Sequence, residues 1–357
     1  MFSFCRISRA GTFDRTKGLH SARKRFYEIS ALAFVISTAV LSPAQGSANG
    51  PGGQTAETIR IWGHGHHGQD YIQTLLTAWQ NGFRKSHPDA RFEDTLYGDA
   101  SGLGGIYTGV ADLAILDRPA SLIEVDAFQQ GAGYDPFSIP VARGSVSTPH
   151  HAPALVVYVN RANPLTHLTL RELDGIFDAD HRLGNRGYKT WGDLGLTGEW
   201  AAQPIRLYSL AIQSAEVQFF ERAALGGSQK FSCGLRLFHN QPRLSAEQQI
   251  AAAIAKNRYG LALSLLPAAN LKAIPISGTD SAAAVLPTPA TITADTYPLS
   301  RTVYVYANRK PKSAVPAKVA AFLDYIVSPE GQAIVARTGG YLPLSSDLAA
   351  KAKESLQ

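Results

Sequence analysis

Patterns typical of strands alternate with patterns typical of helices along most of this chain, and this alternation restricts its fold more than any other feature. Apolar and polar residues alternate over Thr58–Trp62, and apolar residues then recur at helical spacing from Tyr71 to Phe83. The same order of strand and helix returns several times before residue 327. Such alternation predicts an α/β fold with a mostly parallel sheet.

The same reading places the remaining elements. Further strands are expected at 91–97, 111–116, 155–159, 205–210, 259–265 and 302–306. Further helices are expected at 169–177, at 246–256 and at 317–327. Another helix follows the strand at 205–210 and includes Phe219 and Ala224. About 300 residues follow the first 48, and by usual domain sizes this length predicts two domains.

Several expected strands end in small or polar loops that lead into helices. The first ends in a Gly-rich loop over residues 63–68, and residues 98–105 form a second Gly-rich turn. The third strand ends at Asp117-Arg118, and the strand that ends at Leu210 precedes Ser214. Ligands of open α/β sheets bind at the carboxyl ends of strands, and helix N-termini favour anions. The loops therefore predict an anion-binding region.

The first loop also fits the dinucleotide fingerprint GxGxxG between a strand and a helix. Glu93 and Asp94 stand roughly where an acid that binds a ribose would lie. A lone fingerprint is a weak signal, and the bulky His66 and His67 at its variable positions would crowd a pyrophosphate. Binding of a small anion is therefore the preferred interpretation.

Motifs spread over residues 58–345 resemble a known family. They are Val156–Asn160 with Asn163–Leu165, Leu168–Leu170 leading to Gly175–Phe177, Thr190–Asp193, Tyr297–Arg301, Ser328–Gln332 and Gly340–Leu344. Together they resemble the phosphate-binding proteins of bacterial phosphate importers, within the class of type II periplasmic binding proteins. The resemblance implies a two-lobed α/β fold, with mixed sheets flanked by helices and a central cleft for the ligand.

The resemblance also implies an organisation and a function. One lobe would comprise residues 57–155 plus 300–350 and the other residues 156–299, with chain crossings near 155–159 and 300–306. The protein would capture phosphate or a phosphate-like anion in the periplasm for an ABC importer, whose membrane permease is the expected partner. We expect a monomer that is not an enzyme and needs no cofactor.

Ligand residues follow from the resemblance position by position. The first loop, which in the family gives backbone N–H groups and a hydroxyl, carries histidines here. Leu210 stands where the family has an arginine, and Glu216 replaces a threonine. The first change removes a bidentate anion contact, and the second adds repulsion. Arg118 or protonated histidine would have to compensate. The expected ligand residues are His64, His66, His67, Ser101, Asp117, Arg118, Ser214 and Glu216.

The histidines support a second hypothesis. Five of the ten fall in two short segments, at 64–67 and at 150–151. Imidazoles bind zinc, copper and nickel, so an exported metal-dependent hydrolase is the alternative function. No HExxH helix, GxSxG turn or P-loop accompanies them. We therefore expect hydrogen-bonding histidines and no metal. Binding of a different small solute, or a structural or signalling role, remains open.

The N-terminal segment, residues 1–48, has the order of a secretory signal. Basic Arg23–Arg25 precede an uncharged, mostly apolar run over Ile29–Leu41, and small residues follow. The run is shorter than the about 20 apolar residues that span a bilayer. The segment also carries +5 of the formal net charge of +6, so the rest of the chain is nearly neutral. Binding to nucleic acid is therefore not expected.

Cleavage of this segment is directly testable. The small residues before Asn49 predict a mature N-terminus between Gln45 and Asn49. N-terminal sequencing of protein exported by a bacterial host measures it. A mature protein held in the membrane with residues 1–40 intact would contradict the prediction.

Overall fold

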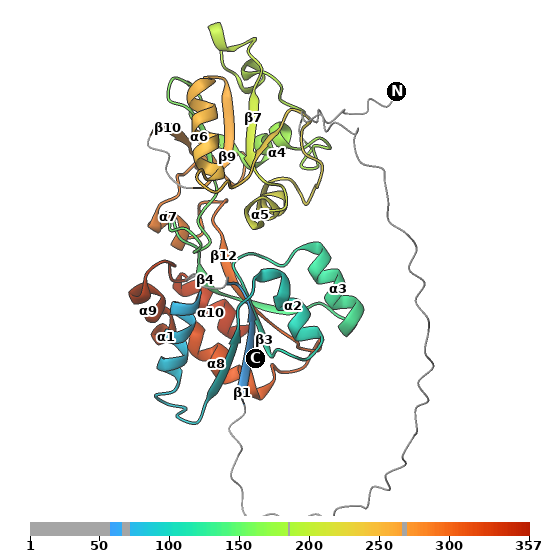
Figure 1. Cartoon of the computed structure of the whole chain (residues 1–357), viewed down its shortest axis with the longest axis vertical. Helices are drawn as coiled ribbons and strands as arrows, with labels where there is room; N and C mark the ends of the chain where they lie inside the picture. Colours follow the sequence, from blue (N-terminus) through green and yellow to red (C-terminus); the bar gives the residue numbers. More distant parts are fainter. Residues whose placement is uncertain (1–57, 66–71, 185, 266–269) are drawn as a thin grey trace, which may run out of the picture. The chain divides into compact units, whose positions relative to one another are not determined.

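Two five-stranded sheets organise the chain (Figure 1). The computed structural model describes residues 58–65, 72–184, 186–265 and 270–357. The predicted signal segment at 1–48 therefore lies outside the described residues, as do His66 and His67. Within the described part of the chain, no helix has the length and apolar character needed to cross a membrane.

The first sheet has the strand order β2-β1-β3-β12-β4. Its strands are β1 (Thr58–Gly63), β2 (Arg91–Thr95), β3 (Leu113–Leu116), β4 (Phe137–Arg143) and β12 (Thr302–Ala307). β1 is parallel to both neighbours, whereas β12 is antiparallel to β3 and β4. The helices of this part are α1 (Gln73–Phe83), α2 (Asp99–Tyr107), α3 (Leu122–Ala132), α8 (Ala317–Val327), α9 (Pro329–Thr338) and α10 (Ser346–Glu354). We call this part the first lobe.

The second sheet has the order β10-β5-β9-β7-β8 and is also mixed. Its strands are β5 (Val156–Asn160), β7 (Arg206–Leu210), β8 (Arg236–Phe238), β9 (Gly260–Ser264) and β10 (Leu271–Ile274). The helices of this second lobe are α4 (Leu170–Phe177), α5 (Ala215–Ala224), α6 (Ala246–Lys256) and α7 (Pro289–Thr293), with 3-10 turns at Trp191–Leu194 and Gly198–Trp200. A two-stranded sheet pairs β6 (Leu168–Thr169) with β11 (Ile276–Ser277).

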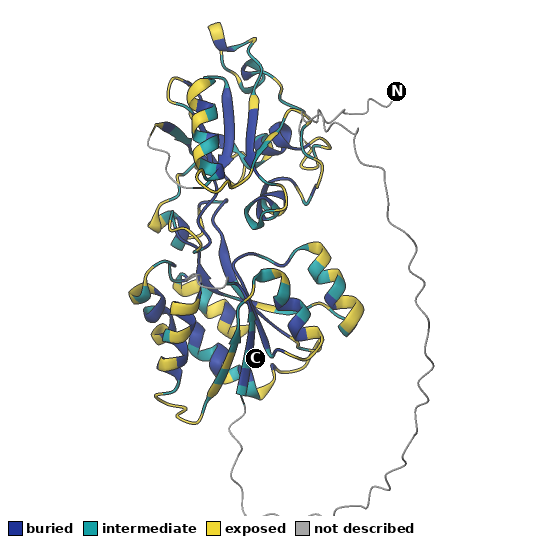
Figure 2. Ribbon diagram, in the orientation of Figure 1, coloured by how far each residue is buried: buried dark blue, intermediate teal, exposed yellow. Residues whose placement is uncertain are grey.

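Burial explains why these segments form sheets and helices. Figure 2 shows β7, β9 and β12 buried along most of their length. β1 alternates between buried and half-buried residues, as its sequence predicted. Trp79 of α1 is fully buried in the first lobe, and Trp191 is fully buried in the second. The α/β fold with mixed sheets is confirmed: only β12 in the first sheet and β5 in the second run against the other strands of their sheet.

The Gly-rich segment at 98–105 forms helix α2, so its interpretation as a turn is wrong. A Cβ at Gly102 would lie 2.8 Å from Leu116, and one at Gly105 would lie 2.9 Å from Trp62. The glycines therefore let the helix approach the sheet closely. Intrinsic helix propensity disfavours glycine, but close packing against the sheet outweighs it here.

The chain passes between the sheets twice, and the two passages bond to each other. The first follows β4, and the second precedes β12. Gly144 N–H donates to the Arg301 carbonyl at 2.9 Å, and Leu155 N–H donates to the Leu299 carbonyl at 3.1 Å. Residues 299–301 are therefore fixed between the two sheets.

Gly63 offers a test of how the fold positions the loop after β1. Its φ is +129°, and a Cβ there would lie 2.1 Å from the Ile115 carbonyl oxygen. We expect Gly63→Ala to lower the free energy of unfolding by about 2–3 kcal/mol. Urea unfolding of the purified protein measures the change.

Gly104→Ala is the matched control, because a Cβ at Gly104 meets no atom within 4 Å. Alanine should stabilise α2 there by up to about 1 kcal/mol. Equal stability of the two variants would show that Gly63 is not constrained.

Candidate functional site

Charged side chains gather where β1 and β3 end. His64 follows β1, Asp117 follows β3, and Asp99 opens α2. The first two come together because β1 and β3 are parallel neighbours, and His64 N–H donates to the Ile115 carbonyl at 2.7 Å. The Gly98 N–H donates to the Gly63 carbonyl at 2.9 Å, which brings the start of α2 to the same edge. Sheet register and one backbone hydrogen bond at the start of α2 thus build this cluster.

His64 lies between two carboxylates. Its Nδ1 is 3.2 Å from an Asp99 oxygen, and its Nε2 is 3.7 Å from an Asp117 oxygen. The Nε2 also lies 3.3 Å from the carbonyl oxygen of His150. His64 is 5% exposed and Asp117 4%. Both ring nitrogens therefore face acceptors, which favours the doubly protonated imidazolium.

Arg301 is the main cation of the site, and it was not among the predicted ligand residues. It is 1% exposed. Its Nη2 is 2.5 Å from Asp117, and its Nη1 is 3.1 Å from Glu216 of α5. One guanidinium therefore bridges carboxylates of the two lobes. The sequence contained the signal, since Arg301 closes the motif Tyr297–Arg301 at a chain crossing, but only burial shows that its charge needs partners.

Two predicted ligand residues of the first lobe turn to other partners. Arg118 makes a bidentate pair with Glu124, at 2.7 and 2.8 Å. Ser101 donates its hydroxyl to the Gly98 carbonyl at 2.8 Å. Neither residue lines the cleft described below. The cation expected at Arg118 is instead supplied to the cleft by Arg301.

The second lobe contributes the start of α5. Ser214 is the N-cap, and its hydroxyl oxygen accepts from the Val217 N–H at 3.3 Å. Glu216 lies in the first turn, and Leu210 ends β7 at the same edge of the sheet. The N-terminus of α5 therefore presents N–H groups and one carboxylate to the cleft.

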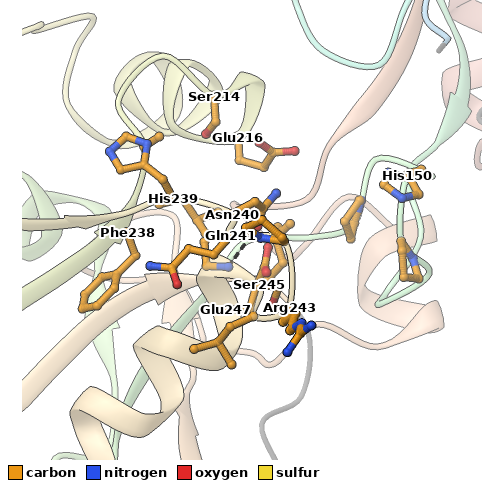
Figure 3. A pocket seen from close by; sticks show the side chains of 18 of the residues that line it. His150, Ser214, Glu216, Phe238, His239, Asn240, Gln241, Arg243, Ser245 and Glu247 are labelled. Carbon is orange, nitrogen blue, oxygen red and sulfur yellow. Dashed lines mark hydrogen bonds between the residues drawn. The ribbon is translucent and has the colours of Figure 1, made fainter. Parts of the chain in front are cut away.

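A cleft of about 750 Å³ is lined by residues of both lobes. Asp117 and Arg301 line it from the first lobe, and Ser214 and Glu216 line it from the second. Figure 3 shows the last two on the helix facing residues 238–247, which run from the end of β8 through a loop into the first turn of α6. This segment adds Phe238, His239, Asn240, Gln241, Arg243 and Glu247, none of which the sequence had singled out. His150 also lines the cleft, whereas the His151 ring packs against Tyr341.

The pKa values of Asp99 and Asp117 are shifted in opposite directions. Burial raises the pKa of Asp117, and the charges of Arg301 and His64 only partly offset it. Burial acts on Asp99 in the same direction, but the hydrogen bond and charge of His64 bring its pKa below the ordinary value. Burial by itself lowers the pKa of His64, but Asp117 and Asp99 outweigh it and raise the pKa above 6.5. The surroundings thus strengthen proton binding by His64 and by Asp117 and weaken it at Asp99.

His64, Asp99 and Asp117 also place one potential metal ligand each within 4.8 Å of one another. Arg301 already contacts Asp117, and the Nε of Arg118 is 3.8 Å from Asp99. A divalent cation among these carboxylates would meet two guanidinium groups at close range. The arrangement fits an internally neutralised ionic cluster better than a metal centre.

Comparison with known proteins identifies the family. The family model described as the PBP superfamily domain matches residues 52–330. The chain belongs to this superfamily. It is 30% identical over 292 residues to the phosphate-binding protein PstS of Pseudomonas aeruginosa, which covers 81% of this chain and 85% of that protein.

Solved structures show the same fold. PstS of Borrelia burgdorferi matches with a TM-score of 0.54 and 16% identity, over 81% of this chain and 100% of that chain. An ABC-type phosphate transport receptor of Vibrio cholerae matches with a TM-score of 0.52 and 18% identity, over 80% of this chain and 100% of that chain. These likenesses confirm the type II binding-protein fold.

The raised pKa of His64 predicts how stability depends on pH. A histidine whose pKa is higher in the folded state than in the unfolded state stabilises the folded protein. This stabilisation is complete below the unfolded-state pKa of about 6.5 and is lost as pH rises through the folded-state pKa. We therefore expect the midpoint of thermal unfolding to fall by about 1–3 °C as pH rises from about 6.5 to 9.

His64→Asn should remove this loss, because an amide can keep the hydrogen bond to Asp99 but does not titrate in that range. The exposed His167 provides the control variant His167→Asn, which should keep the wild-type profile. A wild-type profile retained in His64→Asn would show that His64 does not carry the extra proton.

Proposed function

We propose that the chain is an exported solute-binding protein that captures phosphate or a phosphate-like anion for an ABC importer. The observation that carries this proposal is the buried guanidinium of Arg301, which lines the cleft beside the N-terminus of α5. The family position for a cation holds Leu210, so Arg301 supplies the positive charge from the other lobe. The 30% identity to a phosphate-binding protein supports the same ligand class.

Two features of the site support a tetrahedral oxyanion. The guanidinium of Arg301 offers a planar set of donors, and the start of α5 adds backbone N–H groups and the Ser214 hydroxyl. Asp117 lies between these donors and His64, where it can accept a proton from the anion or donate its own. The ligand set that we propose is Asp117, Ser214 and Arg301, with His64 behind Asp117.

The cellular role follows from the family and from the leader segment. A periplasmic location agrees with the signal pattern of residues 1–48, and delivery of the anion requires a membrane permease as partner. We propose lobe boundaries at 57–155 plus 300–350 and at 156–299, which agree with the way the strands divide between the two sheets. Binding, rather than catalysis, is the role proposed for the cleft.

Titration calorimetry with inorganic phosphate tests the site. We expect Arg301→Gln to weaken binding on the order of 100-fold, because it removes the buried guanidinium of the cleft. Glu216→Thr should tighten binding about tenfold, because it removes a carboxylate and leaves Arg301 available to the anion.

Glu247→Thr is the control, since Glu247 also lines the cleft but lies in α6. It should change the affinity for phosphate less than Glu216→Thr does. Since Arg301 is fully buried, unfolding curves must first show that Arg301→Gln folds. A folded wild-type protein that binds no phosphate would reject the proposed ligand.

A further inference from the structure

The charged side chains that line the cleft favour a ligand with more groups than an inorganic anion has. Among the described residues that line it, Asp117, Glu216 and Glu247 carry carboxylates, whereas Arg243 and Arg301 carry guanidinium groups. His150 and His239 also line the cleft. Arg243 is exposed, so the buried cation is Arg301, and it is already shared by Asp117 and Glu216. A dianion entering this cleft must therefore compete with two carboxylates for its one buried guanidinium.

Occupation of Arg301 by an anion has a consequence for Glu216. The side chain of Glu216 is 23% exposed, and Arg301 is its one ionic partner among the described residues. An oxyanion that takes the Nη1 donor of Arg301 leaves the Glu216 carboxylate partly desolvated and without that partner. Leaving one member of a buried ion pair uncompensated is more costly than exchanging both members. A ligand that brings its own cation would restore the balance.

We propose that the solute is a phosphate monoester that carries a cationic group, such as an amine, a few bonds from the phosphate. The phosphate binds Arg301 and the N-terminus of α5, and the cationic group pairs with Glu216. The Arg301–Glu216 pair is thereby exchanged for two pairs with the ligand, and each charge keeps a partner. This inference rests on the proposed function, and it specifies the substrate class of the same site.

The shape and lining of the cleft agree with an organic ligand. Its volume of about 750 Å³ lies within the range of pockets that hold drug-sized molecules, about 300–1,000 Å³, and exceeds what a single tetrahedral anion fills. Leu210, Phe238 and Leu265 provide apolar surface for a carbon linker. Leu210 thus has a role here that an arginine at this position would not have.

Calorimetry with matched probes tests the proposal on the mature protein. The probes are inorganic phosphate, ethyl phosphate and 2-aminoethyl phosphate, of which the last two differ by one amine. We expect 2-aminoethyl phosphate to bind at least about tenfold more tightly than ethyl phosphate, the size of one charge-assisted pair. Glu216→Gln should bring the two affinities within about threefold of each other.

Glu247→Gln is the matched control and should keep the full preference for the amine. Equal affinities of the wild-type protein for the two esters, with phosphate still bound, would overturn the inference and leave the proposed function standing. A preference that survives Glu216→Gln would also overturn it, because the amine would then pair elsewhere. If no phosphate compound binds the folded protein, both the inference and the proposed function fail.

Discussion

The burial of Arg301 between the two sheets is the constraint on which the site depends. A guanidinium that is 1% exposed needs counter-charges, and they come from Asp117 at the end of β3 and from Glu216 at the start of α5. The side chain cannot move away easily, because its backbone carbonyl accepts from Gly144 of the other chain passage. The passage between the sheets therefore places a fixed positive charge in the cleft.

The remaining charges are arranged around this one. Asp117 contacts Arg301 on one side and His64 on the other, and His64 continues to Asp99. Arg118 is held by Glu124, which keeps its charge out of the cleft and near Asp99. Such a chain of alternating charges gives each of these buried ions a counter-charge without requiring a ligand, and an incoming anion must exchange partners within it.

The family relationship and the charged groups of the cleft both support anion binding, but they place the cation on different residues. The superfamily match covers residues 52–330, and the fold has the mixed sheets that the motifs implied. Leu210 stands where the family has an arginine, so the second lobe lacks the expected cation. Arg301, at the chain crossing, places a cation in the cleft instead. The anion-binding function can thus persist while the position of the charge changes, because the cleft needs a guanidinium but does not fix the strand that carries it.

The sequence by itself determined the α/β class and most elements, because hydrophobic periodicity reports which face of a strand or helix is buried. The two-lobed organisation came from the resemblance of its motifs to a known family. Helices at 246–256 and 317–327 were predicted to the residue. The sequence also pointed to His64, Asp117, Ser214 and Glu216, since each follows a strand or opens a helix. Only the tertiary structure decided that Ser101 bonds within its own helix, that Arg118 pairs with Glu124, and that Arg301 bridges both lobes. Periodicity is a local property, whereas the partner of a buried charge is set by contacts between residues far apart in the chain.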